Sequence, residues 1–189
     1  NRPKVMLPVA GKSVLEHNLE QLAATKAFDE AVIVVGFCSE QIMTKFRSNY
    51  GSKGTDVPLS TLGGKNKIKL AYAFQTEQLG TGHALLQAEK FVWKEEKFLV
   101  IMGDDLYSSD NIKKCLKHNS CLLAKKVPNI GNFGKIIAEK GMLKGIVEKP
   151  DENGSGLANT ACYVLPKEIF QLLRKLKKSS RGEYEITDA

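Results

Sequence analysis

The sequence predicts an α/β layered domain with a mixed, mainly parallel sheet. First, short apolar runs that are typical of buried strands alternate with amphipathic segments that are typical of helices. Second, glycines follow some of these runs, as expected where a strand passes into a turn. Third, residues 134–139 and 143–149 flank the turn Lys140–Gly141 and predict a β-hairpin, which adds an antiparallel part.

The first half of the chain supplies helices and strands in alternation. Ser13 and Ser39 are each expected to cap a helix, because a serine hydroxyl accepts the free N–H groups at a helix start. Between these serines, residues 31–35 predict a strand that is buried on both faces. Residues 51–66 are rich in Gly and Ser and predict a loop, and residues 68–74 predict the next strand.

The remaining elements continue the alternation. Pro166 is expected to open the last helix, in the first turn where proline is tolerated. The other expected elements are a strand-like run at 5–9, helices at 81–92 and 110–118, and strands at 98–102, 121–127 and 160–165.

Charge and composition disfavour two classes of partner. The 189 residues carry a net charge of +7, but the excess is almost all lysine, whereas arginine supplies the forks that read phosphates and guanines. No nucleic-acid partner is therefore expected. No apolar run approaches the roughly 20 residues that span a bilayer, so no membrane is expected either. Without a targeting signal, the cytoplasm is the expected location.

Several kinds of catalytic site are also disfavoured. The four cysteines form no zinc-type spacing with the histidines and are expected to be reduced thiols. The sequence contains no P-loop, no GxGxxG and no nucleophile elbow. Walker ATPases, Rossmann dehydrogenases and hydrolase triads are therefore poorly supported.

The sharpest local feature is the acidic turn Gly103–Asp104–Asp105, which follows the expected strand at 98–102. In open α/β sheets, ligands bind beyond the carboxyl ends of the strands. An acidic residue at that place is suited to hold Mg²⁺ together with a nucleotide phosphate. An acidic turn in solvent is the competing interpretation.

Residues 75–83 (QTEQLGTGH) form a second candidate. The glycines allow close backbone approach to a flat ligand, and the amide of Gln75 can read a base edge. The pattern alone favours an ordinary strand-to-helix turn, with His83 as a capping or packed side chain. By the same reasoning Lys4 is explained as surface charge, and residues 148–150 (EKP) as the end of the hairpin.

The combination of motifs is more specific than any one of them. Together they resemble the sugar-1-phosphate nucleotidylyltransferases across essentially the whole chain. Residues 75–84 look most like the uridylyltransferase domain that makes UDP-N-acetylglucosamine, and residues 146–150 are more like glucose-1-phosphate thymidylyl- and uridylyltransferases. The motifs, in chain order, are PKVMLPVAGK at 3–12, EQLGTGHA at 77–84, Gly103–Asp104, GIVEKP at 145–150 and Asn159–Thr160.

The resemblance implies a role for each matching residue. Asp104 is implied to bind Mg²⁺, ahead of Asp105, whereas Gly11 and Lys12 are expected to be structural. The implied catalytic residues are Lys4, Asp104 and Lys149; the nucleotide-binding residues are Lys4, Gln75, Gly80 and Thr81; and the sugar-binding residues are Gly134, Glu148, Lys149 and Asn159.

The resemblance also implies a fold, a reaction and substrates. The fold is a Rossmann-like, three-layer α/β/α nucleotidyltransferase domain of the glycosyltransferase-A type. The implied reaction is in-line transfer of a nucleotidyl group from UTP, or dTTP, to a sugar-1-phosphate, with release of pyrophosphate and without a covalent intermediate. N-acetylglucosamine is slightly favoured over glucose, and UTP over dTTP. A homo-oligomer is left open.

Residues 1–189 are expected to be one nucleotidyltransferase domain that is incomplete at both ends. The family places a strand and a Gly-rich GxGxR loop before the motif at 3–12, and a second metal ligand beyond the segment 182–189. Asp188 is not expected to replace that ligand. The alternative function is a non-catalytic, nucleotide-sugar-binding regulatory subunit of the same fold, which would need neither the loop nor the second ligand.

Overall fold

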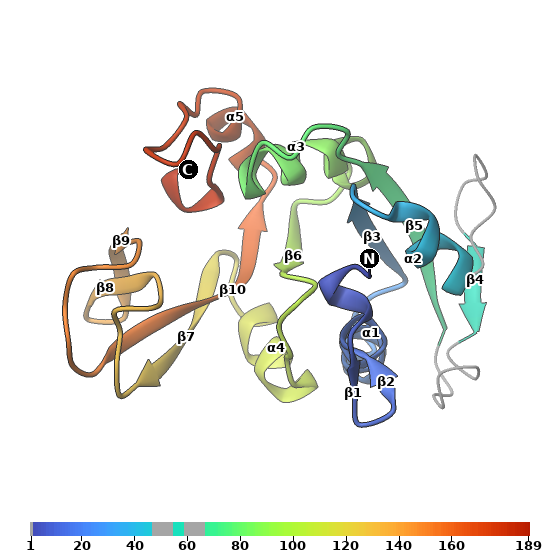
Figure 1. Cartoon of the computed structure of the whole chain (residues 1–189), viewed down its shortest axis with the longest axis horizontal. Coiled ribbons are helices and arrows are strands. Elements are labelled where there is room, and N and C mark those ends of the chain that lie inside the picture. The colour runs from blue at the N-terminus through green and yellow to red at the C-terminus, as the bar shows by residue number, and fades with distance from the viewer. Residues whose placement is uncertain (1, 47–54, 59–66) are drawn as a thin grey trace.

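The computed structural model describes residues 2–46, 55–58 and 67–189 (Figure 1). Helices and strands alternate up to residue 116, and strands dominate the region that follows. The elements of the first region are η1 (Lys4–Met6), β1 (Pro8–Val9), β2 (Lys12–Ser13), α1 (Val14–Thr25), β3 (Glu30–Val35), α2 (Ser39–Lys45), β4 (Thr55–Pro58), β5 (Lys67–Phe74), α3 (Thr81–Val92), β6 (Lys97–Ile101) and α4 (Ser109–Leu116). Those of the second are β7 (Cys121–Val127), β8 (Lys135–Glu139), β9 (Met142–Val147), β10 (Gly156–Pro166), α5 (Ile169–Leu173) and η3 (Ile186–Asp188).

The described strands form three sheets, the smallest of which is the antiparallel pair β1–β2. β3 and β5 pair in parallel, and β4 joins β5 antiparallel, in the order β3–β5–β4. A five-stranded antiparallel sheet has the order β6–β10–β8–β9, with β7 also paired to β10. Figure 1 shows the β8–β9 hairpin and the β3–β5–β4 sheet at opposite ends of the molecule, with β6 between them. The α/β class with parallel and antiparallel pairing is confirmed, but the expectation of a mainly parallel sheet is wrong for the described strands, since only β3 and β5 pair in parallel.

Helices cover both faces of this framework. Leu15, Leu19 and Leu22 of α1 pack with Leu70 of β5 in one buried cluster. On the other face, α3 and α5 form a second cluster. Alternate residues of β3 contact these two clusters, with Ile33 in the first and Val34 in the second. Both faces of β3 are therefore covered, as the apolar run predicted.

Ser13 caps α1, as predicted, and the structure shows that it does so within a capping box. The N–H of Glu16 donates to Oγ of Ser13, and the N–H of Ser13 donates to the carboxylate of Glu16 over 2.6 Å. The preceding β1–β2 turn contains Gly11 at φ 85°, and Lys12 forms an ion pair with Glu20 at 2.6 Å. These contacts support the structural role expected of Gly11 and Lys12.

Three local predictions are wrong. The N-cap of α2 is Cys38, in the left-handed region at φ 55°, so Ser39 is already helical. Residues 5–9 form no single strand, because the N–H of Met6 turns back onto the carbonyl of Pro3 and begins η1. Pro166 ends β10 opposite Lys97, where its missing N–H is tolerated, and α5 begins later, at Ile169.

The segment 51–66, predicted to be a loop, contains a short strand. Residues Thr55–Pro58 pair antiparallel with β5 at its amino-terminal half. The rest of that segment lies outside the described residues. All four cysteines are free, with Cys115 and Cys162 buried and the other two half-buried. In the part of the chain that is described, no helix is long and apolar enough to cross a membrane.

Candidate functional site

Lys4 and Asp104 are brought to the same place by their neighbours in the chain. A Cβ built on Gly103 would lie 2.9 Å from Cγ1 of Val5. Only a residue without a side chain therefore fits between η1 and the turn after β6. Lys4 and Asp104 flank this contact, and both are exposed to solvent. The segment that carries the predicted phosphate-binding lysine therefore packs against the turn that carries the predicted metal ligand, at the carboxyl end of β6.

The acidic turn itself is anchored by α1. Nδ2 of the buried Asn18 donates to the carbonyl oxygen of Asp105 over 2.7 Å. Partial burial raises the pKa of the Asp105 carboxyl, and the nearby charge of Asp104 raises it further. The two carboxylates therefore repel each other, and a bound cation would relieve that repulsion.

Tyr107 joins this turn to the next strand of the sheet. Its hydroxyl donates to the carbonyl oxygen of Thr160 over 2.8 Å and accepts from the N–H of Met102 over 3.3 Å. Burial, with the charge of Asp105, raises the pKa of Tyr107, so the ring keeps its proton and remains a donor. The edge that carries Asp104 is in this way continuous with the part of β10 that carries Asn159.

The predicted sugar-binding residues also form a cluster. The N–H of Asn159 donates to the carbonyl oxygen of Gly134 over 2.8 Å. A Cβ built on Gly134 would lie 2.9 Å from Oε1 of Glu148. The side chain of Asn159 is partly engaged, because Nδ2 donates to the hydroxyl of Tyr163 and Oδ1 accepts from the N–H of Ala161. One N–H and one lone pair of that amide remain for a ligand.

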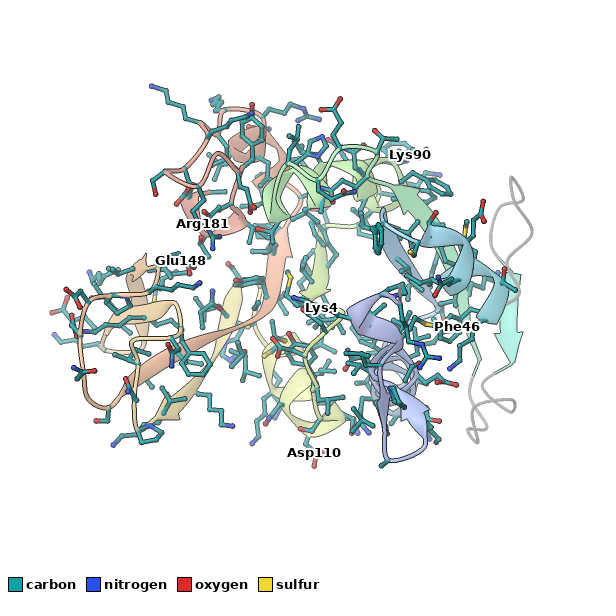
Figure 2. All side chains as sticks on the ribbon, viewed as in Figure 1. Lys4, Phe46, Lys90, Asp110, Glu148 and Arg181 are labelled. Carbon is teal, nitrogen blue, oxygen red and sulfur yellow. The ribbon has the colours of Figure 1, made fainter. Side chains whose placement is uncertain are left out.

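A cavity of about 270 Å³ opens between the end of β9 and residues 179–188, which we call the C-terminal segment. Glu148 and Lys149 line one side of it, and Figure 2 shows Arg181 on the opposite side from Glu148. Lys149 is exposed and has a φ of 41°, in the left-handed region, so the turn after β9 carries backbone strain beside the cavity. The full lining is Ile146, Glu148, Lys149, Ser179, Ser180, Arg181, Glu185 and Asp188.

Arg181 is a candidate phosphate-binding residue that the sequence motifs did not indicate. The buried carboxylate of Glu185 accepts from Nε of Arg181 over 3.0 Å, from Nη2 over 2.7 Å and from Oγ of Ser179 over 2.6 Å. Burial alone would raise the pKa of Glu185, but these hydrogen bonds outweigh burial and lower it. No local sequence signal indicates this pair, because the i,i+4 rule applies to helices and residues 181–185 lie between α5 and η3.

The predicted nucleotide-binding loop is packed against the same C-terminal segment. A Cβ on Gly80, whose φ is 104°, would lie 2.6 Å from the carbonyl oxygen of Tyr184. That oxygen accepts from the N–H of Gly82 over 2.8 Å, and Oγ1 of Thr81 accepts from the N–H of Ile186 over 3.0 Å. Gly80 and Thr81 therefore hold this segment in place, so the segment bridges the loop and the cavity.

The candidate residues thus fall into three groups. Lys4 with Asp104, Gly134 with Glu148 and Asn159, and Gln75 with Gly80 and Thr81 are each brought together. No hydrogen bond or ion pair between described side chains joins Lys4 or Asp104 to Lys149. Within the described ranges, no group of three His, Cys, Asp or Glu side chains could hold a metal ion by itself.

Comparison with known proteins decides the family. The nucleotidyl transferase family matches residues 1–189. The chain belongs to this family. The expected relationship to sugar-1-phosphate nucleotidylyltransferases is thereby confirmed.

Two curated relatives illustrate the relationship. The chain is 34% identical over 192 residues to the bifunctional protein GlmU of Methanococcus maripaludis (strain C7), and this match covers 100% of the chain and 41% of that protein. It is 29% identical over 197 residues to the UTP–glucose-1-phosphate uridylyltransferase AglF of Haloferax volcanii, covering 100% of the chain and 74% of that protein. The chain therefore spans about two fifths of the length of the GlmU relatives.

Solved structures share the fold. A UDP-glucose pyrophosphorylase complexed with UDP-glucose superimposes with a TM-score of 0.80 at 27% identity, covering 98% of this chain and 76% of that one. HddC from Yersinia pseudotuberculosis superimposes with a TM-score of 0.69 at 20% identity, covering 99% and 75%. The second likeness concerns the fold alone.

Proposed function

We propose that the protein transfers a nucleotidyl group from a nucleoside triphosphate to a sugar-1-phosphate and releases pyrophosphate. The observation that supports the proposal is the contact of Val5 with Gly103, which brings the segment of Lys4 against the turn of Asp104 at the carboxyl end of β6. A cation and a carboxylate at that place suit a nucleotide phosphate with its metal ion. The names of the relatives, which include a glucose-1-phosphate uridylyltransferase, support the same reaction.

The reaction is an in-line displacement at the α-phosphorus. A phosphate oxygen of the sugar-1-phosphate forms the new P–O bond, and the bond to pyrophosphate breaks. Lys4 stabilises the negative charge on the nucleotide phosphates, and Lys149 with Arg181 orients the attacking phosphate beside the cavity. Burial raises the pKa of Cys121 to about 11 and of Cys162 to about 12, so neither thiol is a ready nucleophile.

The residues present fit Mg²⁺ at Asp104. Magnesium keeps several waters and is bound by one or two carboxylates together with substrate phosphates, so a cluster of three protein ligands is not required. Asp104 is exposed at the strand end, and its repulsion with Asp105 favours a cation there. When bound, Mg²⁺ neutralises phosphate charge during the transfer.

The substrates are proposed from the residues that line each part of the site. Gln75, Gly80 and Thr81 bind the nucleotide. UTP and dTTP offer the same N3–H edge to these residues. UTP is placed ahead of dTTP because of the likeness of the loop motif. Gly134, Glu148, Lys149 and Asn159 bind the sugar phosphate. N-acetylglucosamine-1-phosphate is placed ahead of glucose-1-phosphate on the Asn159–Thr160 motif, whereas the relative AglF is named for glucose-1-phosphate.

Pyrophosphate release by the full-length protein tests the proposal. UTP and dTTP are each combined with N-acetylglucosamine-1-phosphate and with glucose-1-phosphate, in the presence of Mg²⁺. Release that depends on both the nucleotide and one sugar phosphate is the expected result, and it identifies the substrate pair. A folded protein that binds UTP but releases no pyrophosphate with any pair would instead be a nucleotide-sugar-binding regulatory subunit.

A further inference from the structure

The side-chain amide of Gln75 is held from two directions. Its Nε2 donates to the carbonyl oxygen of Gly80 over 3.0 Å and lies 3.1 Å from Nδ1 of His83. A backbone carbonyl can only accept a hydrogen bond, so the nitrogen of the amide, and not its oxygen, faces Gly80. The contact with Gly80 therefore fixes the orientation of the amide.

The contact with His83 decides which polar atoms of Gln75 stay free. A primary amide carries two N–H groups. One is directed at Gly80, and the other is used within the protein when Nδ1 of His83 carries no proton. Between described residues, no hydrogen bond engages Oε1 of Gln75. An acceptor is then all that this side chain offers to a ligand.

The neighbouring Gln87 competes for the same imidazole. Nε2 of Gln87 lies 3.2 Å from Nε2 of His83 and donates to the carbonyl oxygen of His83 over 3.2 Å. A neutral imidazole accepts at one nitrogen only, so it cannot serve both amides. Gln87 lies on the surface of α3 with a half-buried side chain that can turn to solvent, whereas Gly80 holds Gln75. The proton therefore resides on Nε2, and Nδ1 accepts from Gln75.

We propose that His83 is a positioning residue that makes Gln75 an acceptor toward the nucleobase, and that it thereby selects bases with an N–H donor on the Watson–Crick edge. The inference rests on the proposed function, in which Gln75 reads the base. Uracil and thymine present an N3–H group, which Oε1 can accept. Cytosine presents an acceptor at N3, which Oε1 repels. His83 therefore separates UTP and dTTP from CTP, but not UTP from dTTP.

Nucleotide binding to the full-length protein tests this role, because it needs no turnover. UTP, dTTP and CTP are titrated by calorimetry into the wild type and the variants His83→Leu, His83→Ala, His83→Asn and Gln87→Leu. Loss of the imidazole releases one N–H of Gln75, which can then donate to N3 of cytosine. His83→Leu and His83→Ala are expected to lower the ratio of UTP to CTP affinity about tenfold. His83→Asn can place an amide oxygen near the position of Nδ1 and is expected to recover most of the ratio.

Gln87→Leu is the matched control, since it removes the other contact of the ring and should keep the ratio. Two loss variants are included so that the test survives if one of them fails to fold. An unchanged UTP to CTP ratio in a folded His83→Leu or His83→Ala protein would overturn the role of His83 and leave the proposed function standing. A wild type that binds neither UTP nor dTTP would contradict the proposed function itself.

Discussion

Val5 and Gly103 are in contact so close that a methyl group on residue 103 would lie 2.9 Å from Cγ1 of Val5. Gly103→Ala should therefore push η1 away from the turn that carries Asp104. Because charge stabilisation depends on placement within less than 1 Å, we expect turnover to fall by about tenfold to a hundredfold. Steady-state kinetics of pyrophosphate release measures the effect.

A compensating change separates this geometric effect from general damage. Val5→Ala removes Cγ1, the methyl group that the methyl added at position 103 would strike. The double variant Val5→Ala/Gly103→Ala should therefore recover a large part of the lost turnover. An additive loss in the double variant would argue against the spacing explanation.

Gly80 should tolerate no side chain, because a Cβ there would lie 2.6 Å from the carbonyl oxygen of Tyr184 and the φ is 104°. We expect Gly80→Ala to lower the free energy of unfolding by about 3 kcal/mol. The matched control is Gly141→Ala, since Gly141 has a φ of 79° and no atom within 4 Å, so strain alone should cost about 1 kcal/mol. Urea unfolding that finds equal losses in both variants would refute the docking of the C-terminal segment against this loop.

Gly134 should affect sugar binding more than stability. A Cβ at Gly134 would meet the carboxylate end of Glu148 at 2.9 Å, and a flexible side chain can move aside at little cost. We expect Gly134→Ala to raise the KM for the sugar phosphate about tenfold, with the KM for UTP unchanged. Gly145→Ala in the same hairpin has open space around the added methyl and should change neither constant. A rise in the KM for UTP alone would move Glu148 out of the sugar site.

The ionisation of Glu185 should make the free energy of unfolding depend on pH in the acid range. Its pKa is lowered in the folded protein, so the unfolded chain binds the proton more readily and stability rises with pH in that range. This contribution is complete above the ordinary glutamate pKa of about 4.3 and is lost as the pH falls through the lower, folded-state pKa. Glu185→Gln should cost about 1 kcal/mol at pH 7 and flatten the decline of stability at low pH. Glu183→Gln, two residues earlier, is the matched control. If the free energy of unfolding of Glu185→Gln varied with pH as that of the wild type does, the ion pair of Glu185 with Arg181 would be refuted.

Much of the fold is local and could be predicted. The limits of α3 and β7 agree with the expected ranges 81–92 and 121–127, because apolar periodicity and flanking turns determine both. The cap of α1 was predicted from Ser13 alone, although Glu16, three residues later, also indicates the capping box that the structure shows. Periodicity says nothing of the backbone reversal at η1 or of the left-handed Cys38, because both depend on hydrogen bonds of single N–H groups.

Sequence motifs indicated candidate site residues, but they did not indicate the contacts that these residues make. Motifs indicated Gly80 and Thr81 as nucleotide ligands, but they did not indicate that both residues also contact Tyr184 and Ile186, about a hundred positions away. The contact between Val5 and Gly103 was not predicted either, because these residues are also about a hundred positions apart. Contacts between remote segments follow from tertiary packing, which a local pattern does not encode.

Asp104, in the turn that packs against η1, is proposed to support nucleotidyl transfer. The most direct measurement is sugar-phosphate-dependent pyrophosphate release from UTP with Mg²⁺ by the full-length wild type, Asp104→Ala and the neighbouring control Asp105→Asn. Asp104 is exposed, so its removal should leave the thermal unfolding curve unchanged. We expect Asp104→Ala to lose about a hundredfold or more in kcat, with most activity kept in Asp105→Asn. A folded Asp104→Ala protein with wild-type turnover in Mg²⁺ would contradict the account.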